Sequence, residues 1–344
     1  MIIIQDMKKL IVICSLLSLM TSCKTEELWF KGDYFFLRHK GSDMPIWVRG
    51  NLASKIFILH LHGGPGGSSI DEGVEKVYLP IENDYAMVYW DQRASGGSQG
   101  NTKAETLTME QFVGDVELVI DLLNSRYNNP TIFLHGHSWG GALGAAFLGK
   151  GENQNKVKGW IELNGAHNWK LGMELSVQWV KDYADAAISE SRDVSFWTNA
   201  LSWYDKNPVI DNLELMDKHA EHVSRAKGYI YDINNPNLQR FSGWQLWSPS
   251  GDLNKDTFTK EHLIDELQKS YSDGLNQVTI PALILWGRHD GILPVELAQE
   301  AYDALGTDSL NKQMVIFENS AHSPNREEPD LFIQKMKQFI YQYK

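Results

Sequence analysis

Short, nearly continuous apolar runs recur along the chain and predict buried strands. The clearest are residues 55–62 (KIFILHLH), 85–90 (YAMVYW), 131–134 (TIFL), 157–163 and 281–286. Unbroken runs of this length are typical of strands that are covered on both faces, as in a parallel sheet. Residues 34–37 and 46–48 predict a hairpin around residues 41–43, and residues 313–317 predict a last strand.

Segments with helical spacing separate these runs. Thr108 opens a capping-box pattern, and apolar residues then recur at helical spacing as far as Leu123. The small residues of 139–149 predict a helix packed tightly on a sheet, and residues 295–304 and 329–341 predict two more helices. Alternating strands and helices favour an α/β fold with a mostly parallel central sheet and helices on both faces.

Residues 166–276 interrupt this alternation. Helical stretches such as 173–188 dominate there, and the segment holds six of the twelve tryptophans: Trp169, Trp179, Trp197, Trp203, Trp244 and Trp247. We therefore expect an inserted, mainly helical cap at 166–276, between a first part of the core at 24–165 and a second part at 277–344.

The first 23 residues resemble an export signal. Lys8 and Lys9 precede an apolar run, residues 10–20, that is too short to span a bilayer comfortably. Small residues then precede Cys23, as in a bacterial lipobox. The pattern predicts a lipoprotein of the cell envelope, in which Cys23 carries the lipid and the anchor makes the only membrane contact. The alternative is an ordinary signal peptide that happens to contain a cysteine.

Composition narrows the possible partners. The net charge is −12 and no cluster of Lys and Arg is visible, so nucleic-acid binding is not expected. Of the two cysteines, Cys14 would be removed with the signal, so neither a disulfide nor a cysteine metal site is expected in the mature chain. No H-E-x-x-H pattern is present, and neither a metal nor a cofactor is predicted.

The strongest chemical signal is G-x-S-x-G at residues 136–140. It lies between a predicted strand and a predicted helix, the context in which a sharp turn exposes a nucleophilic serine, here Ser138. Such a serine needs a base and an acid that orients the base, in the chain order Ser, Asp or Glu, His. Asp290 and His322 fit this order, and each closely follows a predicted strand. His62, His137 and His289 do not fit and are expected to pack or to form hydrogen bonds.

The reaction also needs donors for an oxyanion. The backbone N–H of Trp139, which follows the nucleophile, is one candidate. The second should come from the glycine-rich loop 62–67, where Pro65 has no N–H; Gly63 or Gly64 must donate, and Gly64 is favoured. A plain turn or a phosphate-binding loop is the alternative, although the Lys-Ser/Thr ending of a phosphate loop is absent.

Three motifs together resemble the proline iminopeptidase family of α/β-hydrolases. They are HGGPG at 62–66, DQRASGGS at 91–98 and GHSWGG at 136–141, and the resemblance covers the core on both sides of the cap. It implies an α/β-hydrolase fold and a serine exopeptidase that removes an N-terminal residue, often proline, under a helical cap. The family has glycine where this chain has Ala94. Asp91 and Arg93 are expected to brace loops.

The cap departs from the family at one position. The family pattern resembles W-x-x-W-E, whose glutamate binds the free amine of the substrate; here Trp244 and Trp247 are followed by Ser248. The two tryptophans are expected to contact an apolar substrate group, or else to attach the cap to the core. Asp252 or Glu174 could replace the missing carboxylate.

Two other functions therefore remain open. One is an esterase, lactonase or amidase of the same fold that needs no free amine. The other is a lipid-anchored binding protein on an inactive scaffold. An inactive scaffold would not need to keep Ser138, Asp290 and His322 together, which argues against this alternative. In either enzymatic case the partner is a small-molecule or peptide substrate.

Overall fold

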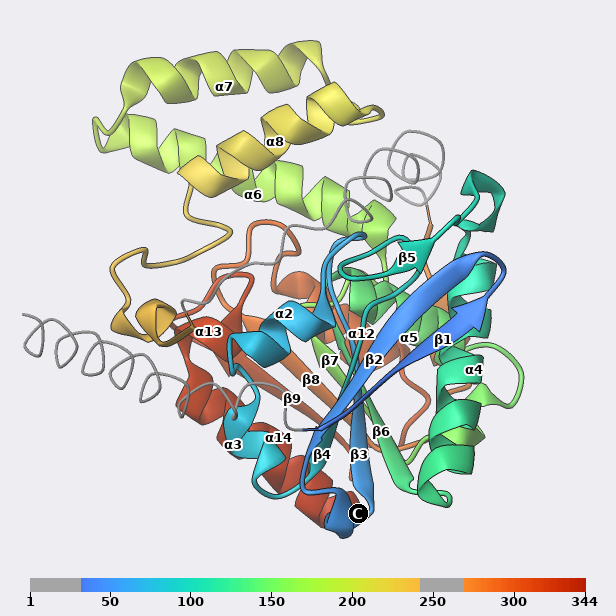
Figure 1. Ribbon diagram of the computed structural model, residues 1–344. Helices are drawn as coiled ribbons and strands as arrows, with labels where there is room; N and C mark the ends of the chain where they lie inside the picture. Colours follow the sequence, from blue (N-terminus) through green and yellow to red (C-terminus); the bar gives the residue numbers. More distant parts are fainter. Residues whose placement is uncertain (1–31, 242–268) are drawn as a thin grey trace, which may run out of the picture. The chain divides into compact units, whose positions relative to one another are not determined.

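Nine strands form a single sheet in the part of the chain that the computed structural model describes, residues 32–241 and 269–344 (Figure 1). The strands are β1 (Asp33–His39), β2 (Ser42–Gly50), β3 (Ile56–Leu61), β4 (Ala86–Trp90), β5 (Gln99–Gly100), β6 (Thr131–His137), β7 (Gly159–Leu163), β8 (Ala282–Gly287) and β9 (Lys312–Phe317). Their order is β1-β2-β4-β3-β6-β7-β8-β9, with β5 paired to β2. β2 is antiparallel to β4 and β5, and each neighbouring pair from β4 to β9 is parallel. The predicted mostly parallel sheet is confirmed.

The register brings the carboxyl ends of the parallel strands to one edge. Leu61, the last residue of β3, pairs with Trp90 of β4 on one side and with Gly136 of β6 on the other. His137 of β6 pairs with Leu163 at the end of β7, and β8 and β9 continue the same edge. Residues that follow these strands therefore lie near one another, where α/β sheets build their sites.

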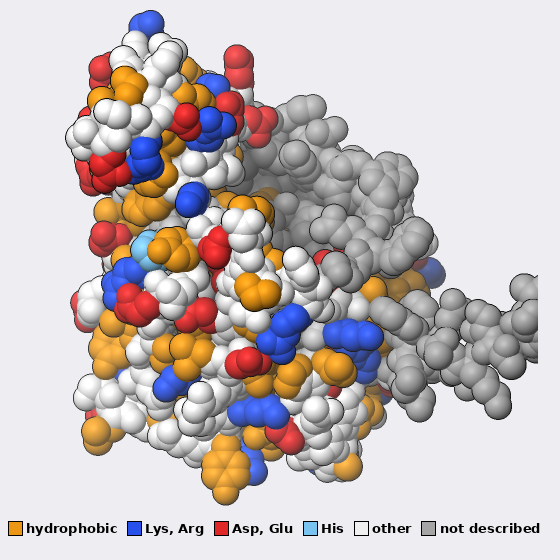
Figure 2. Space-filling model, turned by 90° about the vertical axis from the view of Figure 1, so that its left-hand side faces the viewer, with side chains coloured by type: hydrophobic (Ala, Val, Ile, Leu, Met, Phe, Trp, Pro, Cys, Tyr) orange, Lys and Arg blue, Asp and Glu red, His pale blue; other side chains and the backbone are white. Residues whose placement is uncertain are grey.

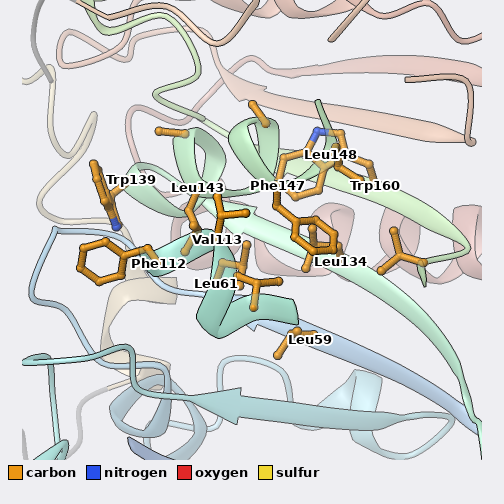
Figure 3. Packing of buried hydrophobic residues seen from close by; sticks show 14 of the residues in the cluster. Leu59, Leu61, Phe112, Val113, Leu134, Trp139, Leu143, Phe147, Leu148 and Trp160 are labelled. Carbon is orange, nitrogen blue, oxygen red and sulfur yellow. The ribbon is translucent and has the colours of Figure 1, made fainter. Parts of the chain in front are cut away.

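Helices cover both faces of the sheet. They are α2 (Ser69–Val74), α3 (Leu79–Glu82), α4 (Met109–Tyr127), α5 (Trp139–Leu148), α11 (Ser272–Leu275), α12 (Glu296–Ala304), α13 (Pro324–Glu327) and α14 (Pro329–Tyr343). Leu59 and Leu61 of β3 belong to one core cluster with Phe112 of α4 and Leu143 of α5 (Figure 3), whereas Ile58 belongs to the cluster that includes α14. Since full burial of such a side chain contributes about 1.5–3 kcal/mol, β3 is held firmly from both sides.

Three helices follow β7 in the chain: α6 (Trp169–Ser189), α7 (Val194–Lys206) and α8 (Leu213–Arg225). They lie together at the top of Figure 1. They share a small core of their own: Val180, Ala184, Ala187, Trp197, Ala200, Tyr204, Val223 and Ala226. α6 begins earlier than the predicted stretch 173–188, because Asn168 caps it by accepting the backbone N–H of Leu171 at 3.2 Å. We call α6, α7 and α8 the helical insertion.

The surface is of mixed polarity. On the face in Figure 2, basic side chains are interspersed with acidic and apolar ones. Among the helices of residues 32–241 and 269–344, none combines the length and the apolar character needed to cross a membrane.

Candidate active site

Ser138 stands at a sharp turn between β6 and α5. β6 ends at His137 and α5 begins at Trp139, so a single residue makes the change of direction. Ser138 has φ 55° and ψ −119°, a conformation that costs a non-glycine residue about 1–3 kcal/mol. A Cβ on Gly140 would lie 1.9 Å from the backbone oxygen of Leu61, so only glycine fits where α5 passes β3. The tight packing of α5 on β3 thus maintains a strained turn that holds the Ser138 hydroxyl at the carboxyl edge.

Asp290 and His322 lie on the loops after β8 and β9 and are hydrogen-bonded to each other. Nδ1 of His322 lies 2.8 Å from Oδ2 of Asp290, and both residues are buried. Oδ1 of Asp290 accepts the backbone N–H groups of Ile292 at 2.8 Å and Leu293 at 3.0 Å. An ionised carboxylate can only accept, so His322 donates from Nδ1 and keeps Nε2 as its basic nitrogen.

His137 connects the turn of Ser138 with the loop of His322. Its Nε2 lies 3.0 Å from the backbone oxygen of His322, and the two rings are 5.3 Å apart. Burial, together with the proximity of His322, lowers the pKa of His137 to about 4, so His137 is a neutral donor to that carbonyl. Within the described residues, the Ser138 hydroxyl forms no hydrogen bond with His322; such bonds often tighten only when substrate binds. The three predicted residues lie at one end of the sheet, and Asp290 and His322 are already hydrogen-bonded to each other.

The glycine-rich loop 62–67 lies against the serine. A Cβ built on Gly63 would be 3.2 Å from Cβ of Ser138 and 3.7 Å from its Oγ. Trp139 is the first residue of α5, and the N–H groups of a helix's first turn point outward from its end. The two segments that carry Gly64 and Trp139, the predicted oxyanion donors, therefore meet at Ser138.

Gln92, to which the motif alone assigns no role, fixes this loop relative to α5. Its backbone N–H donates to Nε2 of His62 at 3.1 Å, and its side-chain oxygen accepts from Nε1 of Trp139 at 3.1 Å. Nδ1 of His62 then carries the hydrogen toward the backbone oxygen of Gly63, 2.8 Å away. Burial lowers the pKa of His62 to about 4, which keeps the ring in the neutral form that this pattern requires.

Asp91 and Arg93 brace loops around the site. Asp91 accepts the Ser68 hydroxyl at 3.0 Å and the backbone N–H of Gly97 at 2.7 Å. Burial raises the pKa of Asp91 to about 7, although these hydrogen bonds offset part of the rise. Arg93 forms a buried ion pair with Asp115 of α4, at 2.5 and 2.7 Å. Removing one member of such a buried pair typically costs about 3–5 kcal/mol of stability, so Arg93 of the 91–98 motif helps to stabilise the fold.

Asn164 is a site residue that the sequence did not identify. Its Nδ2 donates to Oδ2 of Asp290 at 2.5 Å and to the backbone oxygen of Ala321 at 3.3 Å, and its Oδ1 accepts the N–H of Gly287 at 3.3 Å. It therefore links the loops after β7, β8 and β9. Its position directly after the apolar run 157–163 was the available signal, because Asp290 and His322 were also chosen for positions shortly after predicted strands.

Several predicted residues lie outside the described part of the chain: Cys23, Trp244, Trp247, Ser248 and Asp252. Glu174, the other acid considered for amine recognition, is exposed on α6. Tyr229, for which the sequence predicts no role, lies beside His322 instead. Its ring is 5.6 Å from that of His322, and its backbone oxygen accepts the N–H of His322 at 3.3 Å.

Buried histidines near the site have partners within the protein. Nε2 of His60 lies 3.1 Å from a carboxylate oxygen of Glu72, and Nε2 of His135 lies 3.0 Å from the hydroxyl of Tyr78. In the described ranges, no group of three or more His, Cys, Asp or Glu side chains is arranged to hold a metal ion.

Comparison with known proteins agrees with this fold. A family model described as alpha/beta hydrolase fold matches residues 56–329. A protein of Bacillus subtilis named "Probable aminopeptidase YbaC" is 26% identical over 283 residues, which cover 80% of this chain and 86% of that protein. A proline iminopeptidase of Saccharolobus solfataricus is 26% identical over 294 residues, which cover 83% and 84%. The crystal structure of a proline iminopeptidase from Mycobacterium smegmatis shares the fold, with a TM-score of 0.64 at 19% identity over 90% of this chain and 98% of that one.

Proposed function

The chain belongs to the alpha/beta hydrolase fold family, and on this basis we propose that it is a serine hydrolase. Ser138 is the nucleophile, His322 the general base and Asp290 the acid that orients the base. The proposal is carried by the buried hydrogen bond between Asp290 and His322, at the same sheet edge as the strained turn of Ser138. A serine on such a turn, beside a histidine oriented by a carboxylate, is suited to acyl transfer.

In the proposed reaction, Nε2 of His322 takes the proton of Ser138 while Oγ attacks the carbonyl carbon. The backbone N–H groups of Gly64 and Trp139 stabilise the negative oxygen; one such donor is typically worth about 2.7–4 kcal/mol in the transition state. The imidazolium then protonates the leaving group, and the acyl group remains on Ser138. Water, deprotonated by His322, attacks the acyl carbon, and the acid is released as Ser138 regains its proton.

The finer proposal concerns the substrate. We propose an aminopeptidase that releases an N-terminal residue, with an apolar group next to the scissile carbonyl. Support comes from relatives named proline iminopeptidase, and from Trp244 and Trp247 in a segment that resembles that family's cap. Ser248 favours the alternative, an esterase, lactonase or amidase, because a buried ammonium at that position would lack its carboxylate partner.

Three matched reporters separate these activities: a prolyl anilide, the same anilide with a blocked amine, and a short-chain ester. If an acid of the cap replaces the missing glutamate, the free-amine anilide should have the higher kcat/KM by at least about tenfold, since the blocked substrate would leave that acid without its charge partner at a cost of about 2–5 kcal/mol. Preference for the blocked anilide or the ester would support the alternative. If none is cleaved by an enzyme whose serine still reacts with a phosphonate probe, the apolar-substrate proposal is wrong.

We also propose that Cys23 carries a lipid that holds the catalytic domain at a membrane surface of the cell envelope. Support comes from the apolar run 10–20 and the small residues before the cysteine. Cys23→Ala is expected to move the protein to the soluble fraction or to leave it unprocessed, because the catalytic domain would lose the acyl chains proposed to hold it at the membrane. Cell fractionation and mass spectrometry of the mature N-terminal peptide measure this; an unmodified Cys23 thiol in membrane-free mature protein would contradict it.

A further inference from the structure

A chain of hydrogen bonds crosses the interior of the helical insertion and ends at the loop of Asp290. Its members are buried side chains, each at most 5% exposed: Ser176 of α6, Tyr204 of α7, and His219 and His222 of α8. Ser176 donates its hydroxyl hydrogen to the backbone oxygen of Gly291. His219 follows at 2.8 Å from Ser176 Oγ, then Tyr204 at 2.7 Å from Nδ1 of His219, and then His222 at 3.2 Å from the Tyr204 hydroxyl.

We call this chain of hydrogen bonds the relay. The direction of each of its hydrogen bonds is fixed by the last acceptor, the backbone oxygen of Gly291. A backbone oxygen can only accept, so the Ser176 hydroxyl hydrogen points at Gly291 and its Oγ accepts from Nε2–H of His219. Neutral His219 then has an acceptor at Nδ1, which receives the Tyr204 hydroxyl hydrogen. The Tyr204 oxygen in turn accepts from Nδ1–H of His222. All hydrogens therefore point toward Gly291, and bonds aligned in this way polarise and strengthen one another.

The relay requires a neutral His219, and the surroundings of this ring favour its neutral form. Burial, together with the nearby His222, lowers the pKa of His219 to about 4. Burial raises the pKa of Tyr204, so its hydroxyl keeps its hydrogen. Charged groups near the relay include Lys181, whose Nζ lies 5.8 Å from the Tyr204 ring centroid, and Lys218 and Glu221, which act on His222 with opposite sign.

Gly291 is held by Ser176 and Trp179 of α6 and by Gly228, which follows α8. Besides accepting from Ser176, it donates its N–H to the backbone oxygen of Gly228 at 2.9 Å. Trp179 of α6 covers it so closely that a Cβ there would lie 2.6 Å from the indole ring. Gly291 directly follows Asp290, and its carbonyl shares a peptide group with the N–H of Ile292, which donates to Oδ1 of Asp290. These contacts therefore fix the backbone that holds the carboxylate.

We propose that Ser176, His219 and Tyr204 are positioning residues, which orient Asp290 by fixing the Gly291 carbonyl. The helical insertion then belongs to the framework of the acid–base pair as well as lying over the core. This inference rests on the proposed function, in which Asp290 orients His322.

Ser176→Ala tests the relay where it meets the loop. It removes the donor to Gly291 and the acceptor of His219, and we expect kcat to fall about 10- to 100-fold, because small misplacements of a catalytic group have effects of this size. KM should change by less than about twofold, since no substrate contact is removed. Ser195→Ala, at an exposed position of α7, is the matched control and should leave both constants unchanged.

A double-mutant cycle decides whether the relay acts through Asp290. In an Asp290→Asn background, Ser176→Ala should change kcat by less than about threefold, because residues that act as a unit are not additive. Equal loss in both backgrounds, or a Ser176→Ala enzyme that matches Ser195→Ala, would overturn the inference and leave the proposed function intact. A fully active Asp290→Asn enzyme would refute the role proposed for Asp290 and the relay with it. If Ser176→Ala does not fold, Tyr204→Phe, which removes only the hydroxyl that donates to His219, is judged by the same criteria.

Discussion

Replacing Ser138 with alanine is expected to lower kcat by about 10⁶-fold, because loss of a nucleophile that works with its base removes their joint contribution. The oxyanion donors and the binding site would still give a small residual rate. Initial rates of the purified variant with the best-cleaved of the three reporters measure the loss. His322→Ala should cause a similar loss, since nucleophile and base act as one unit.

Stability measurements show whether the loss is chemical. Alanine, like serine, must adopt φ 55° at position 138, so the free energy of unfolding should be nearly unchanged. Ser138→Gly should raise the free energy of unfolding by about 1 kcal/mol. Glycine adopts this conformation without strain, and the greater entropy of the unfolded glycine chain offsets only part of that gain. Exposed Ser195→Ala should retain full activity. A folded Ser138→Ala enzyme with wild-type kcat would show that another residue is the nucleophile.

Replacing Asp290 with asparagine is expected to lower kcat by about 10⁴-fold. Oδ1 accepts two backbone N–H groups, whereas Oδ2 accepts from His322 and from Asn164. An asparagine that keeps its oxygen toward the backbone donors must turn its NH₂ group toward these two other donors. His322 would then lose the acceptor for its Nδ1–H and adopt the wrong tautomer or orientation.

The control for this variant is Asp185→Asn, which makes the same change at an exposed position of α6 and should be silent. Steady-state kinetics and thermal unfolding of both variants separate a catalytic loss from a folding defect. Wild-type kcat in a folded Asp290→Asn enzyme would mean that another group orients the base.

The sheet and the general placement of the candidate site could be predicted because they depend on local patterns. Unbroken apolar runs such as 55–62 and 281–286 mark strands buried on both faces, and the chain order of the three candidates restricts them to particular loops. Since parallel strands end at one edge, the loops after them had to meet there.

The supporting contacts could not be predicted, because they join residues far apart in the chain. Ser176 meets His219, 43 positions away, and Gly291, 115 positions away. A serine or a histidine in a helix carries no sign of such a partner until the helices pack. Asn164 had a positional signal but no motif. At the position where the resembled family has glycine, Ala94 has φ 49°, a left-handed conformation that costs an alanine about 1–2 kcal/mol and favours glycine.

The mechanism is tested most directly by treating the wild-type protein with a fluorophosphonate and locating the adduct by peptide mass spectrometry. We expect one adduct per chain, on the Ser138 hydroxyl, together with loss of activity in proportion to labelling. His322→Ala should suppress the labelling, because the serine is no longer activated by its base. An active enzyme that carries no adduct, or carries it on another residue, would contradict the assignment of Ser138, and a protein with neither adduct nor activity would favour a binding function.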